Sequence, residues 1–234
     1  MKTAIYMGTR NLYEHMLPAI KSLIVNSDVD KVYIGIEDET FPYKLPDICE
    51  TINLSKQTIF SKDGANFHNR YSYMVMMRIA LAKILPDELD RVLSLDVDTI
   101  VDRDISELWD LPINDYYFAA SHEWHKAEKD YLYCNVGVCL FNLKKMRDGK
   151  TDELIHVLNK IKLDFVEQDA LNMLCQGYIY DMPSEYNSNY YTEPCENPKI
   201  IHHIGRNDLL PTYPDVQKYA AMSFDEVMAR RVKI

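Results

Sequence analysis

The sequence has few basic residues for its length, and this shortage limits the partners it can bind. Its 234 residues include 26 lysines and arginines against 36 aspartates and glutamates, a formal net charge of −10. Nucleic acids are bound through clustered lysine and arginine side chains, so this balance argues against a nucleic-acid partner. A small anionic substrate would need local help from a metal ion or from a few well-placed cations.

The cysteines do not form the pattern of a disulfide framework. There are five, an odd number, and no two are separated by two residues as in a C-x-x-C motif. This usage favours reduced thiols and a cytoplasmic location. Cys134 and Cys139 are an odd number of residues apart, so on one regular strand we expect them on opposite faces.

Long hydrophobic runs are also missing. The longest apolar stretch, residues 74–85, contains Arg78 and Lys83, so we expect no membrane-spanning helix. The first residues, MKTAIYMG, enter a strand-like run directly and are too short for the hydrophobic region of a signal peptide. Residues 229–233 are weakly basic and are predicted to be a frayed helix end. A peripheral contact with a membrane surface is the alternative, which usually needs a larger basic cluster.

Hydrophobic periodicity predicts an α/β fold with a mixed, mainly parallel sheet. Strands are expected at residues 4–7, 32–36, 51–54, 92–95, 116–120, 136–141, 178–181 and 199–204. Helices are expected at residues 12–24, 71–85, 164–175 and 215–229. Alternation in the first half indicates parallel strands joined by crossover helices, whose ligands bind beyond the carboxyl ends of the strands. Without a repeat or a linker, the simplest organisation is one domain over residues 1–234, with a nucleotide-binding half (1–102) and an acceptor and metal-completing half (103–234).

Two carboxylates at a strand end are the most informative feature. Residues 91–102 read RVLSLDVDTIVD, a short apolar run followed by Asp96 and Asp98. Buried carboxylates need a partner, because an unpaired buried charge is costly. One divalent cation such as magnesium or manganese could join both side chains and leave positions open for substrate phosphates. The alternative is a pair of turn-forming aspartates, which are common where strands end.

Three further residues could complete such a site. On the predicted helix 71–85, Arg78 falls on the apolar face, and its permanent charge requires an anion. That anion could be Asp96, a substrate phosphate, or both. In the predicted strand 199–204, His202 and His203 point to opposite faces, so one of them could be a third metal ligand. A lone histidine in such a strand is more often structural.

Four blocks of sequence, in order, resemble glycosyltransferase family 8, which includes glycogenin and bacterial lipooligosaccharide galactosyltransferases. The blocks are MRIALAKILPDELDRVLSLDVDTIV, YCNVGVCLFNLKKMR, EQDALN and IIHHIG. They match an arginine followed by a D-x-D, an N-x-G before a strand, a D-Q-D-x-L-N and a V-x-H-x-x-G. The resemblance implies a single-domain GT-A fold, Rossmann-like. It also implies a metal-dependent, retaining transferase that moves a hexose, glucose or galactose, from a uridine diphosphate sugar to a glycan or other hydroxyl acceptor.

The resemblance also assigns roles to individual positions. It implies that Mn²⁺ (or Mg²⁺) is held by Asp96, Asp98 and His202, with His203 structural. The implied donor-binding residues are Gly8, Thr9, Tyr13, Arg78, Asp96, Val97, Asn135, Gly205 and Arg206, with Tyr13 stacking on uracil. Gln168 and Glu167 are the implied catalytic residues. Because only Glu167 and Asp169 offer a carboxylate near Gln168, we favour attack on the same face from which the leaving group departs.

Two departures from the family pattern affect this interpretation. D-Q-D is E-Q-D here, and Glu167 lies three residues after Asp164, the spacing of a capping box at a helix start. After H-x-x-G the family has a lysine, a proline and a tryptophan that close over the diphosphate, whereas this chain reads GRNDLLPTYP. Arg206 could replace the lysine, or the closing loop could be absent. Residues 181–198, polar and aromatic, form a candidate acceptor loop.

Three other functions remain open from the sequence. A haloacid-dehalogenase-type phosphatase would use Asp96 as nucleophile and Asp98 as acid, but that family places its motif at the first strand and needs a later acidic motif that this chain lacks. A sugar-nucleotide-binding protein with little transfer activity would fit the altered closing motif. With 17 tyrosines, the chain could also glycosylate itself, although no tyrosine is singled out. The oligomeric state is not predicted.

Overall fold

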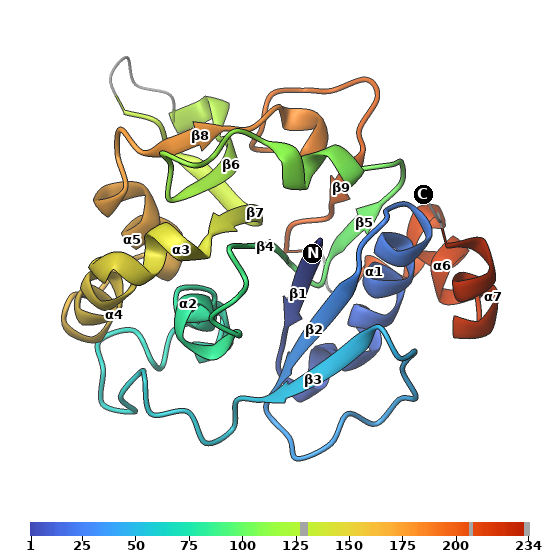
Figure 1. Cartoon of the computed structure of the whole chain (residues 1–234), viewed down its shortest axis with the longest axis horizontal. Coiled ribbons are helices and arrows are strands. Elements are labelled where there is room, and N and C mark those ends of the chain that lie inside the picture. The colour runs from blue at the N-terminus through green and yellow to red at the C-terminus, as the bar shows by residue number, and fades with distance from the viewer. Residues whose placement is uncertain (127–130, 206–207, 232–234) are drawn as a thin grey trace.

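A seven-stranded sheet forms the centre of the computed structural model, which describes residues 1–126, 131–205 and 208–231 (Figure 1). The strands lie in the order β3-β2-β1-β4-β7-β6-β8, and a small second sheet pairs β5 with β9. Their bounds are β1 Thr3–Met7, β2 Lys31–Ile36, β3 Cys49–Asn53, β4 Arg91–Leu95, β5 Thr99–Val101, β6 Phe118–His122, β7 Cys134–Asn142, β8 Ile179–Asp181 and β9 Ile200–His202. Within the large sheet, β7 pairs antiparallel with both neighbours and the other pairings are parallel. The predicted mixed, mainly parallel sheet is therefore confirmed.

Helices cover both faces of this sheet. Figure 1 shows α1, α6 and α7 on one side, and α2, α3, α4 and α5 on the other. The helices are α1 Tyr13–Val25, α2 Leu81–Ile84, α3 Leu143–Lys145, α4 Thr151–Lys160, α5 Val166–Leu174, α6 Pro214–Ala220 and α7 Phe224–Arg230. Short helical turns are η1 Arg10–Leu12, η2 Tyr73–Arg78, η3 Ser106–Asp110, η4 Trp124–Lys126, η5 Met146–Lys150, η6 Ser184–Tyr186 and η7 Leu210–Thr212.

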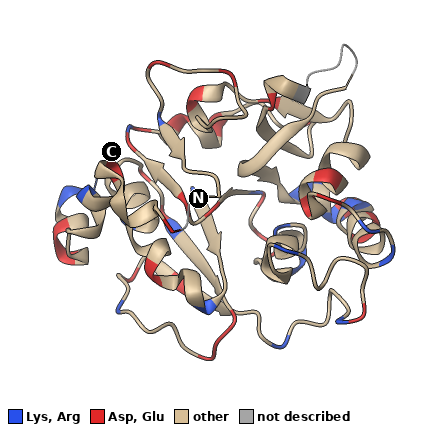
Figure 2. Cartoon of the chain, turned by 180° about the vertical axis from the view of Figure 1, so that it is seen from behind, with Lys and Arg blue, Asp and Glu red and all other residues tan. Residues whose placement is uncertain are grey.

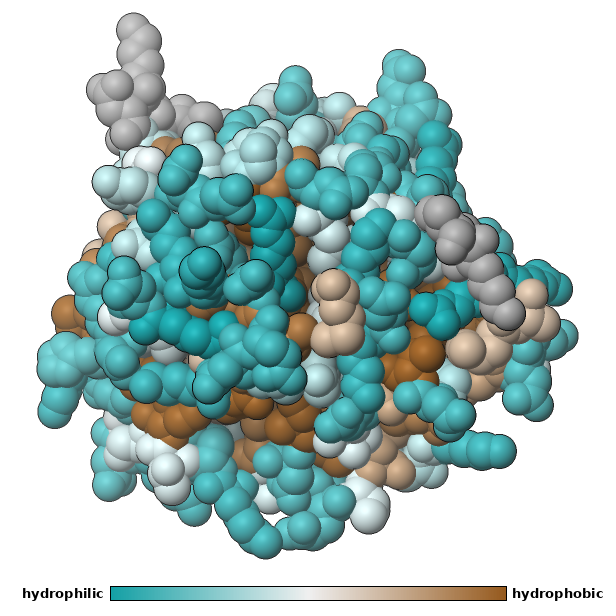
Figure 3. Space-filling model, viewed as in Figure 1, coloured by the Kyte–Doolittle hydropathy of each residue, from teal (hydrophilic) through white to brown (hydrophobic). Residues whose placement is uncertain are grey.

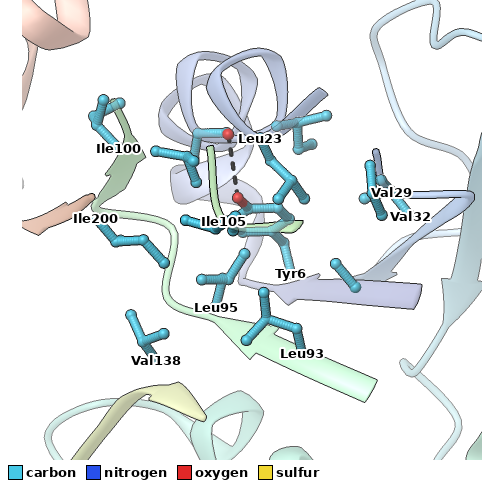
Figure 4. Close-up of a cluster of buried hydrophobic side chains, with 14 of the residues drawn as sticks. Tyr6, Leu23, Val29, Val32, Leu93, Leu95, Ile100, Ile105, Val138 and Ile200 are labelled. Carbon is cyan, nitrogen blue, oxygen red and sulfur yellow. Dashed lines mark hydrogen bonds between the residues drawn. The ribbon is translucent and has the colours of Figure 1, made fainter. Parts of the chain in front are cut away.

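The hydrophobic core consists of two clusters, one on each face of the sheet. Central strands such as β1 and β4 are buried on both faces, which is why their sequences are almost continuously apolar. Figure 4 shows part of the cluster beneath α1, where Leu23, Leu93 and Leu95 surround the ring of Tyr6. The hydroxyl of Tyr6 donates to the carbonyl oxygen of Ala19 at 3.1 Å, so this buried polar group has a partner.

The predicted helix over residues 71–85 is wrong as a continuous element. The chain instead forms the 3-10 turn η2 and the short helix α2. Residues 76–82 are all almost fully buried, whereas a regular amphipathic helix would bury only one stripe. Packing against the sheet and α5 therefore overrides the helical periodicity. Ser72 begins the turn at φ 85° and accepts a hydrogen bond from the backbone N–H of Met74.

Two other helix predictions need correction. The predicted helix 215–229 is interrupted at residues 221–223, because Ser223 starts α7 with a full capping box to Glu226. Helix α4 was not predicted, although Leu154 and Leu158 are spaced to share its buried face. Its start is hidden in the sequence by Gly149, whose φ of 87° breaks the helical run that begins at α3.

A bulge in β7 overturns the prediction for the two cysteines. Ala119 and Ser121, two residues apart on β6, pair with Leu140 and Asn135, five apart on β7. The extra residues change which side chains face which side of the sheet. Cys134 and Cys139 therefore lie in the same buried cluster, not on opposite faces. All five cysteines are free.

The surface carries many charges of both signs. Figure 2 shows Asp and Glu spread over the helices and loops, with Lys and Arg among them. Figure 3 shows a mostly hydrophilic face, on which hydrophobic side chains reach the surface mainly in the lower half. Among the residues that the structure describes, no helix is long and apolar enough to cross a membrane.

Candidate active site

Asp96 and Asp98 lie in a tight turn at the carboxyl end of β4. The backbone N–H of Asp96 donates to the carbonyl oxygen of Gly137 at 2.8 Å, and the hydroxyl of Thr99 donates to the carbonyl oxygen of Asp96 at 2.7 Å. β5 starts at Thr99 and runs antiparallel to β9, with Thr99 opposite His202. The small sheet therefore carries His202 from more than one hundred residues away to the paired aspartates.

The three side chains form a compact cluster. Nε2 of His202 lies 3.3 Å from Oδ1 of Asp98 and 3.6 Å from Oδ2 of Asp96. One ligand atom from each residue lies within 4.8 Å of the others. The side chain of His202 is 2% exposed and that of Asp96 is 36% exposed, so the cluster opens to solvent beside Asp96. His203 points away, with Nε2 at 2.7 Å from Oδ2 of Asp215, which confirms the predicted opposite orientation of the two histidines.

Hydrogen bonds to Asn187 fix the proton on His202. Nδ2 of Asn187 donates to Oδ1 of Asn135 at 3.0 Å, so its oxygen is the atom that faces His202. Nδ1 of His202 lies 2.8 Å from this oxygen and must donate to it. Although burial opposes the shift, the charge of Asp98 raises the pKa of His202 and favours a proton on Nε2 as well. In the neutral ring, the form that binds a metal, the lone pair is on Nε2, which faces the two aspartates. An orienting partner of this kind is typical of metal-binding histidines.

Gly137 leaves the space that this arrangement needs. A Cβ atom at this position would lie 2.0 Å from Cε1 of His202 and 2.9 Å from Oδ2 of Asp96. Neither distance is compatible with van der Waals contact. Any larger residue in the β7 bulge would therefore displace the histidine, the aspartate or the strand itself.

Arg78 is the buried cation of the site. Its guanidinium forms ion pairs with Asp96 and, at 3.7 Å, with Glu167, and it donates to the carbonyl oxygen of Val136. The expected internal salt bridge to Asp96 is therefore present, although η2 and not a long helix positions the arginine. A contact with a substrate phosphate stays a prediction.

Glu167 is buried beside this arginine. Its side chain does not form the predicted capping box, because the N-cap residue of α5 is Phe165, not Asp164, and makes no side-chain hydrogen bond to the helix. Burial raises the pKa of Glu167 to about 7, although the charge of Arg78 opposes this shift. Burial also raises the pKa of Asp96 against the opposing charges of Arg78 and His202. The single positive charge of Arg78 therefore does not balance the negative charges of both Glu167 and Asp96.

The donor set fits a hard divalent cation. Two carboxylates and one neutral imidazole, open on one side, suit Mg²⁺ or Mn²⁺, which keep positions free for phosphate oxygens. A cation bound there would also offset the negative charge of Asp96, which its surroundings in the protein disfavour. Asp96, Asp98 and His202 are therefore the residues that can hold a metal.

A second network of hydrogen bonds lies next to the cluster of Asp96, Asp98 and His202 and is centred on Glu123. Oε1 of Glu123 accepts from Nδ2 of Asn135 at 3.2 Å and from Nε2 of Gln168 at 3.1 Å. The backbone N–H groups of Val136 and Gly137 donate to the side-chain oxygens of Gln168 and Asn135, respectively, at 3.2 and 3.1 Å. These bonds leave one possible orientation for each amide.

Glu123 is a site residue that the sequence interpretation missed. It follows β6 directly and is 4% exposed. The same argument that singled out Asp96, a carboxylate just after a buried strand, would have found it. The signal was weak because the predicted strand ended at residue 120, whereas β6 continues to His122.

Part of the predicted donor site lines a cavity beside the Asp96, Asp98 and His202 cluster. Its lining residues are Met7, Gly8, Thr9, Leu12, Tyr71, Ser72, Met74, Val75, Arg78, Leu95 and Asp96. The cavity connects the end of β1 to the end of β4, the place where ligands bind in open α/β sheets. The structure thus brings the predicted Gly8 and Thr9 together with Arg78 and Asp96.

Other predicted donor residues lie elsewhere. Tyr13 is 2% exposed, its ring packs against Phe41 and its hydroxyl accepts from the backbone N–H of Glu37 at 2.9 Å. Its ring does not line the cavity, and stacking on uracil stays a prediction. Val97 is buried in the core cluster beneath α1. Gly205 is exposed just after β9 with φ 65°, and Arg206 lies outside the described residues.

A mainly parallel α/β sheet with paired aspartates at the end of its central strand defines the GT-A class of glycosyltransferase fold. Solved structures with this fold support the assignment. A galactosyltransferase, LgtC, in complex with donor and acceptor sugar analogues is 18% identical with a TM-score of 0.72, over 99% of this chain and 97% of that chain. The glycosyltransferase GlyE of Streptococcus pneumoniae TIGR4 is 21% identical with a TM-score of 0.73, over 97% of this chain and 62% of that chain.

The chain belongs to glycosyl transferase family 8, whose family model matches residues 5–207. Among curated relatives, a lipopolysaccharide 1,2-glucosyltransferase of Escherichia coli K12 is 29% identical over 51% of this chain and 40% of its own length. A protein of Haemophilus influenzae described as a putative glycosyltransferase is 26% identical over 55% of this chain and 44% of its own length. The chain thus spans about half the length of the curated relatives it matches. The predicted family is confirmed.

Proposed function

We propose that this protein is a glycosyltransferase that uses a uridine diphosphate sugar and transfers its hexose, glucose or galactose, to a hydroxyl group of a glycan or other acceptor with retention of anomeric configuration. The observation that carries this proposal is the cluster of Asp96, Asp98 and His202 beside the cavity at the ends of β1 and β4. In this proposal the three residues hold Mn²⁺ or Mg²⁺. When bound, such a cation neutralises charge that develops on a diphosphate leaving group.

The protein's own residues contribute binding and orientation. Arg78 lies at the cavity wall next to Asp96, where a guanidinium can meet a phosphate oxygen of the donor. Gly8 and Thr9 border the same cavity, with the short side chains that a nucleotide lying close to the backbone requires. In this proposal Asn135, held between Glu123 and Gly137, hydrogen-bonds hydroxyl groups of the donor sugar.

Retention through same-face attack is consistent with the burial of Glu167 and its ion pair with Arg78. A double displacement would need a carboxylate free to bond the anomeric carbon, but Glu167 is 7% exposed and paired with Arg78. Asp169 accepts from the hydroxyl of Tyr133 at 2.6 Å. We therefore assign Gln168 the role of orienting and stabilising the positively charged sugar centre, through its amide beside Asn135 and Glu123.

The phosphatase alternative has less support than transfer. Asp96 follows the fourth strand along the chain, and its carboxylate is engaged by Arg78. A phosphatase that used Asp96 as its nucleophile would begin with a carboxylate whose negative charge is already offset by the ion pair with Arg78. Sugar-nucleotide binding with little transfer activity is an outcome that the experiment below distinguishes.

The experiment measures release of nucleoside diphosphate from a panel of nucleotide sugars with Mn²⁺, with and without a chelator. We expect chelator-sensitive release from one uridine diphosphate sugar, lost in Asp98→Ala and His202→Ala. Asp102→Ala is the matched control, because Asp102 lies on the same segment but pairs with Lys218. Release that survives the chelator, or that is equal in all three variants, would contradict the proposed metal site. Donor binding without release would identify a binding protein.

A further inference from the structure

Helix α6 follows the residues that the family model matches, yet it belongs to the core of the fold. Figure 1 shows α6 and α7 beside α1, close to the C-terminal end of the described chain. Three of their side chains, Val216, Tyr219 and Val227, are buried in the hydrophobic cluster beneath α1. The C-terminal helices are therefore packed into the protein and are able to restrain what they contact.

The start of α6 holds the residue that follows the metal ligand His202. The ring of His203 stacks on that of Tyr213, with centroids 4.2 Å apart and planes 9° apart. Nε2 of His203 lies 2.7 Å from Oδ2 of Asp215, which is in the first turn of α6. The side chains of His203 and Asp215 are only 13% and 19% exposed, so this hydrogen bond is stronger than one in water. The imidazole of His203 is thus fixed by a ring and by a carboxylate.

The backbone of His203 transmits this restraint to the paired aspartates. Its N–H donates to the carbonyl oxygen of Asp98 at 2.9 Å. His203 is therefore joined to one metal ligand, His202, by a peptide bond and to another, Asp98, by a hydrogen bond. Because each peptide unit is planar, fixing His203 limits the movement of the backbone at His202.

α6 also supports the other strand of the small sheet. Nδ2 of Asn26, at the end of α1, donates to the hydroxyl of Tyr219 at 2.7 Å and to the carbonyl oxygen of Val101 at 2.9 Å. Val101 is the last residue of β5, the strand that begins just after Asp98. Directly or through Asn26, α6 thus contacts both strands of the sheet that carries the metal ligands.

The small sheet needs support of this kind. β5 and β9 pair over three residues each, and a two-stranded sheet is marginally stable by itself. A metal site requires its ligands to be held in position by packing and hydrogen bonds around them. Asn187 holds the ring of His202, whereas the contacts of His203 hold the backbone on which His202 and Asp98 are placed.

We infer that Tyr213 and Asp215 are positioning residues of the metal site, and that they act through His203. By fixing its side chain, they keep the backbones of Asp98 and His202 in the relative position in which both side chains can meet one cation. This inference rests on the proposed metal site. It gives α6 a part in a site whose ligands all lie earlier in the chain.

Calorimetric titration with Mn²⁺ measures the effect of removing each contact. Asp215→Ala should lower the affinity for Mn²⁺ about tenfold, as for loss of an outer partner of a metal ligand. Tyr213→Leu, which removes the stacked ring, should also lower it. Ser223→Ala is the matched control, because it removes the capping box with Glu226 and so destabilises the neighbouring helix α7. This variant should bind Mn²⁺ as tightly as the wild type.

A double-mutant cycle tests the route through His203. In His203→Ala the ring that Asp215 holds is gone, so adding Asp215→Ala should not lower the affinity for Mn²⁺ further. Thermal unfolding of the metal-free proteins accompanies each titration. A merely structural role would lower Tm in Asp215→Ala and in Ser223→Ala and leave the affinity of both unchanged. If His203→Ala does not fold, the three single variants decide the question without it.

Each outcome decides for or against the inference. Wild-type affinity in Asp215→Ala and Tyr213→Leu would overturn it and leave the proposed metal site standing. The same holds for an equal loss of affinity in Ser223→Ala, or for a loss from Asp215→Ala that is as large without the His203 ring as with it. If the wild-type protein bound no Mn²⁺, the proposed metal site would be wrong, and the inference with it.

Discussion

At the scale of single residues, the site depends on side chains that hold one another in place. His202 has its Nε2 directed at Asp98 because Asn187 accepts the proton on the other ring nitrogen. Gly137 supplies the space in which the ring fits. Asp96, Asp98 and His202, which the structure brings together, could be singled out from the sequence, because a strand end and the resemblance to the family's motif order point to them. Glu123, Asn187 and Gly137 could not, because their contacts join distant parts of the chain.

Glu167→Gln tests the unusual carboxylate next to Arg78. The pKa of Glu167 in the folded protein is about 7 and its ordinary value is 4.5, so the folded state binds more protons between these values. The contribution of Glu167 to the free energy of unfolding is therefore present at low pH and is lost as pH rises through 7. Relative to the wild type, the variant should gain stability with rising pH, by at most about 3 kcal/mol above pH 7.

Denaturant unfolding of metal-free protein at several pH values measures this difference. Glu153→Gln, on the exposed side of α4, controls for the substitution itself. If Glu167→Gln and the wild type differ in stability by the same amount at pH 5 and at pH 9, the pKa of Glu167 is not raised in the folded protein.

Gly137→Ala tests the space beside the metal ligands. The added methyl group would overlap the ring of His202, so we expect a loss of about 1–3 kcal/mol in stability and loss of metal binding. Gly35→Ala is the control, since its new methyl group would also crowd its nearest neighbours, Met7 and Leu54, which are not part of the metal site. Calorimetric titration with Mn²⁺ decides the outcome, and normal affinity in Gly137→Ala would refute the packing argument.

At the scale of elements, two short pieces of irregular structure position the site. The turn η2 delivers Arg78, and the segment between β8 and β9 delivers Asn187. Regular strands were predictable because their apolar runs are short and bounded. The turn was not, since its sequence has helical periodicity and only burial on all sides prevents a regular helix.

Asn187→Leu tests whether this segment acts on the metal ligand. Without the amide oxygen, His202 loses the partner that fixes its proton, and affinity for Mn²⁺ should fall by about 10- to 100-fold. Asn197→Leu provides the matched control, because Asn197 is exposed in the same segment and contacts only Arg103 among the hydrogen bonds of the described residues. Equal affinity in both variants, measured by calorimetry, would assign Asn187 a structural role alone.

At the scale of the whole molecule, a protein of net charge −10 gathers its buried carboxylates at one end of the central sheet. β4 of the first half pairs with β7 of the second, and β5 pairs with β9, so both halves build the site. The division into a nucleotide-binding half and an acceptor half stays a prediction. The sheet order could not be predicted in detail, because strand order depends on crossover paths that periodicity does not encode.

Cation binding should therefore stabilise the entire fold. At a Mn²⁺ concentration of about 100 times its dissociation constant, binding contributes about 2.7 kcal/mol, which corresponds to an increase in Tm of roughly 5–10 °C for a chain of this size. Thermal unfolding with Mn²⁺ and with a chelator measures the shift. It should vanish in Asp98→Ala and persist in Asp102→Ala, and a shift of equal size in both variants would place the cation elsewhere.

The most direct test of the central claim is calorimetric titration of the protein with UDP, with and without Mn²⁺. If Asp96, Asp98 and His202 hold a cation against a diphosphate, UDP should bind at least tenfold more tightly with Mn²⁺, in keeping with the 1–3 kcal/mol typical of coupling between two bound ligands. His202→Ala should abolish this gain. UDP affinity that is the same with and without Mn²⁺, or a gain that His202→Ala leaves unchanged, would contradict a metal-dependent donor site at the end of β4.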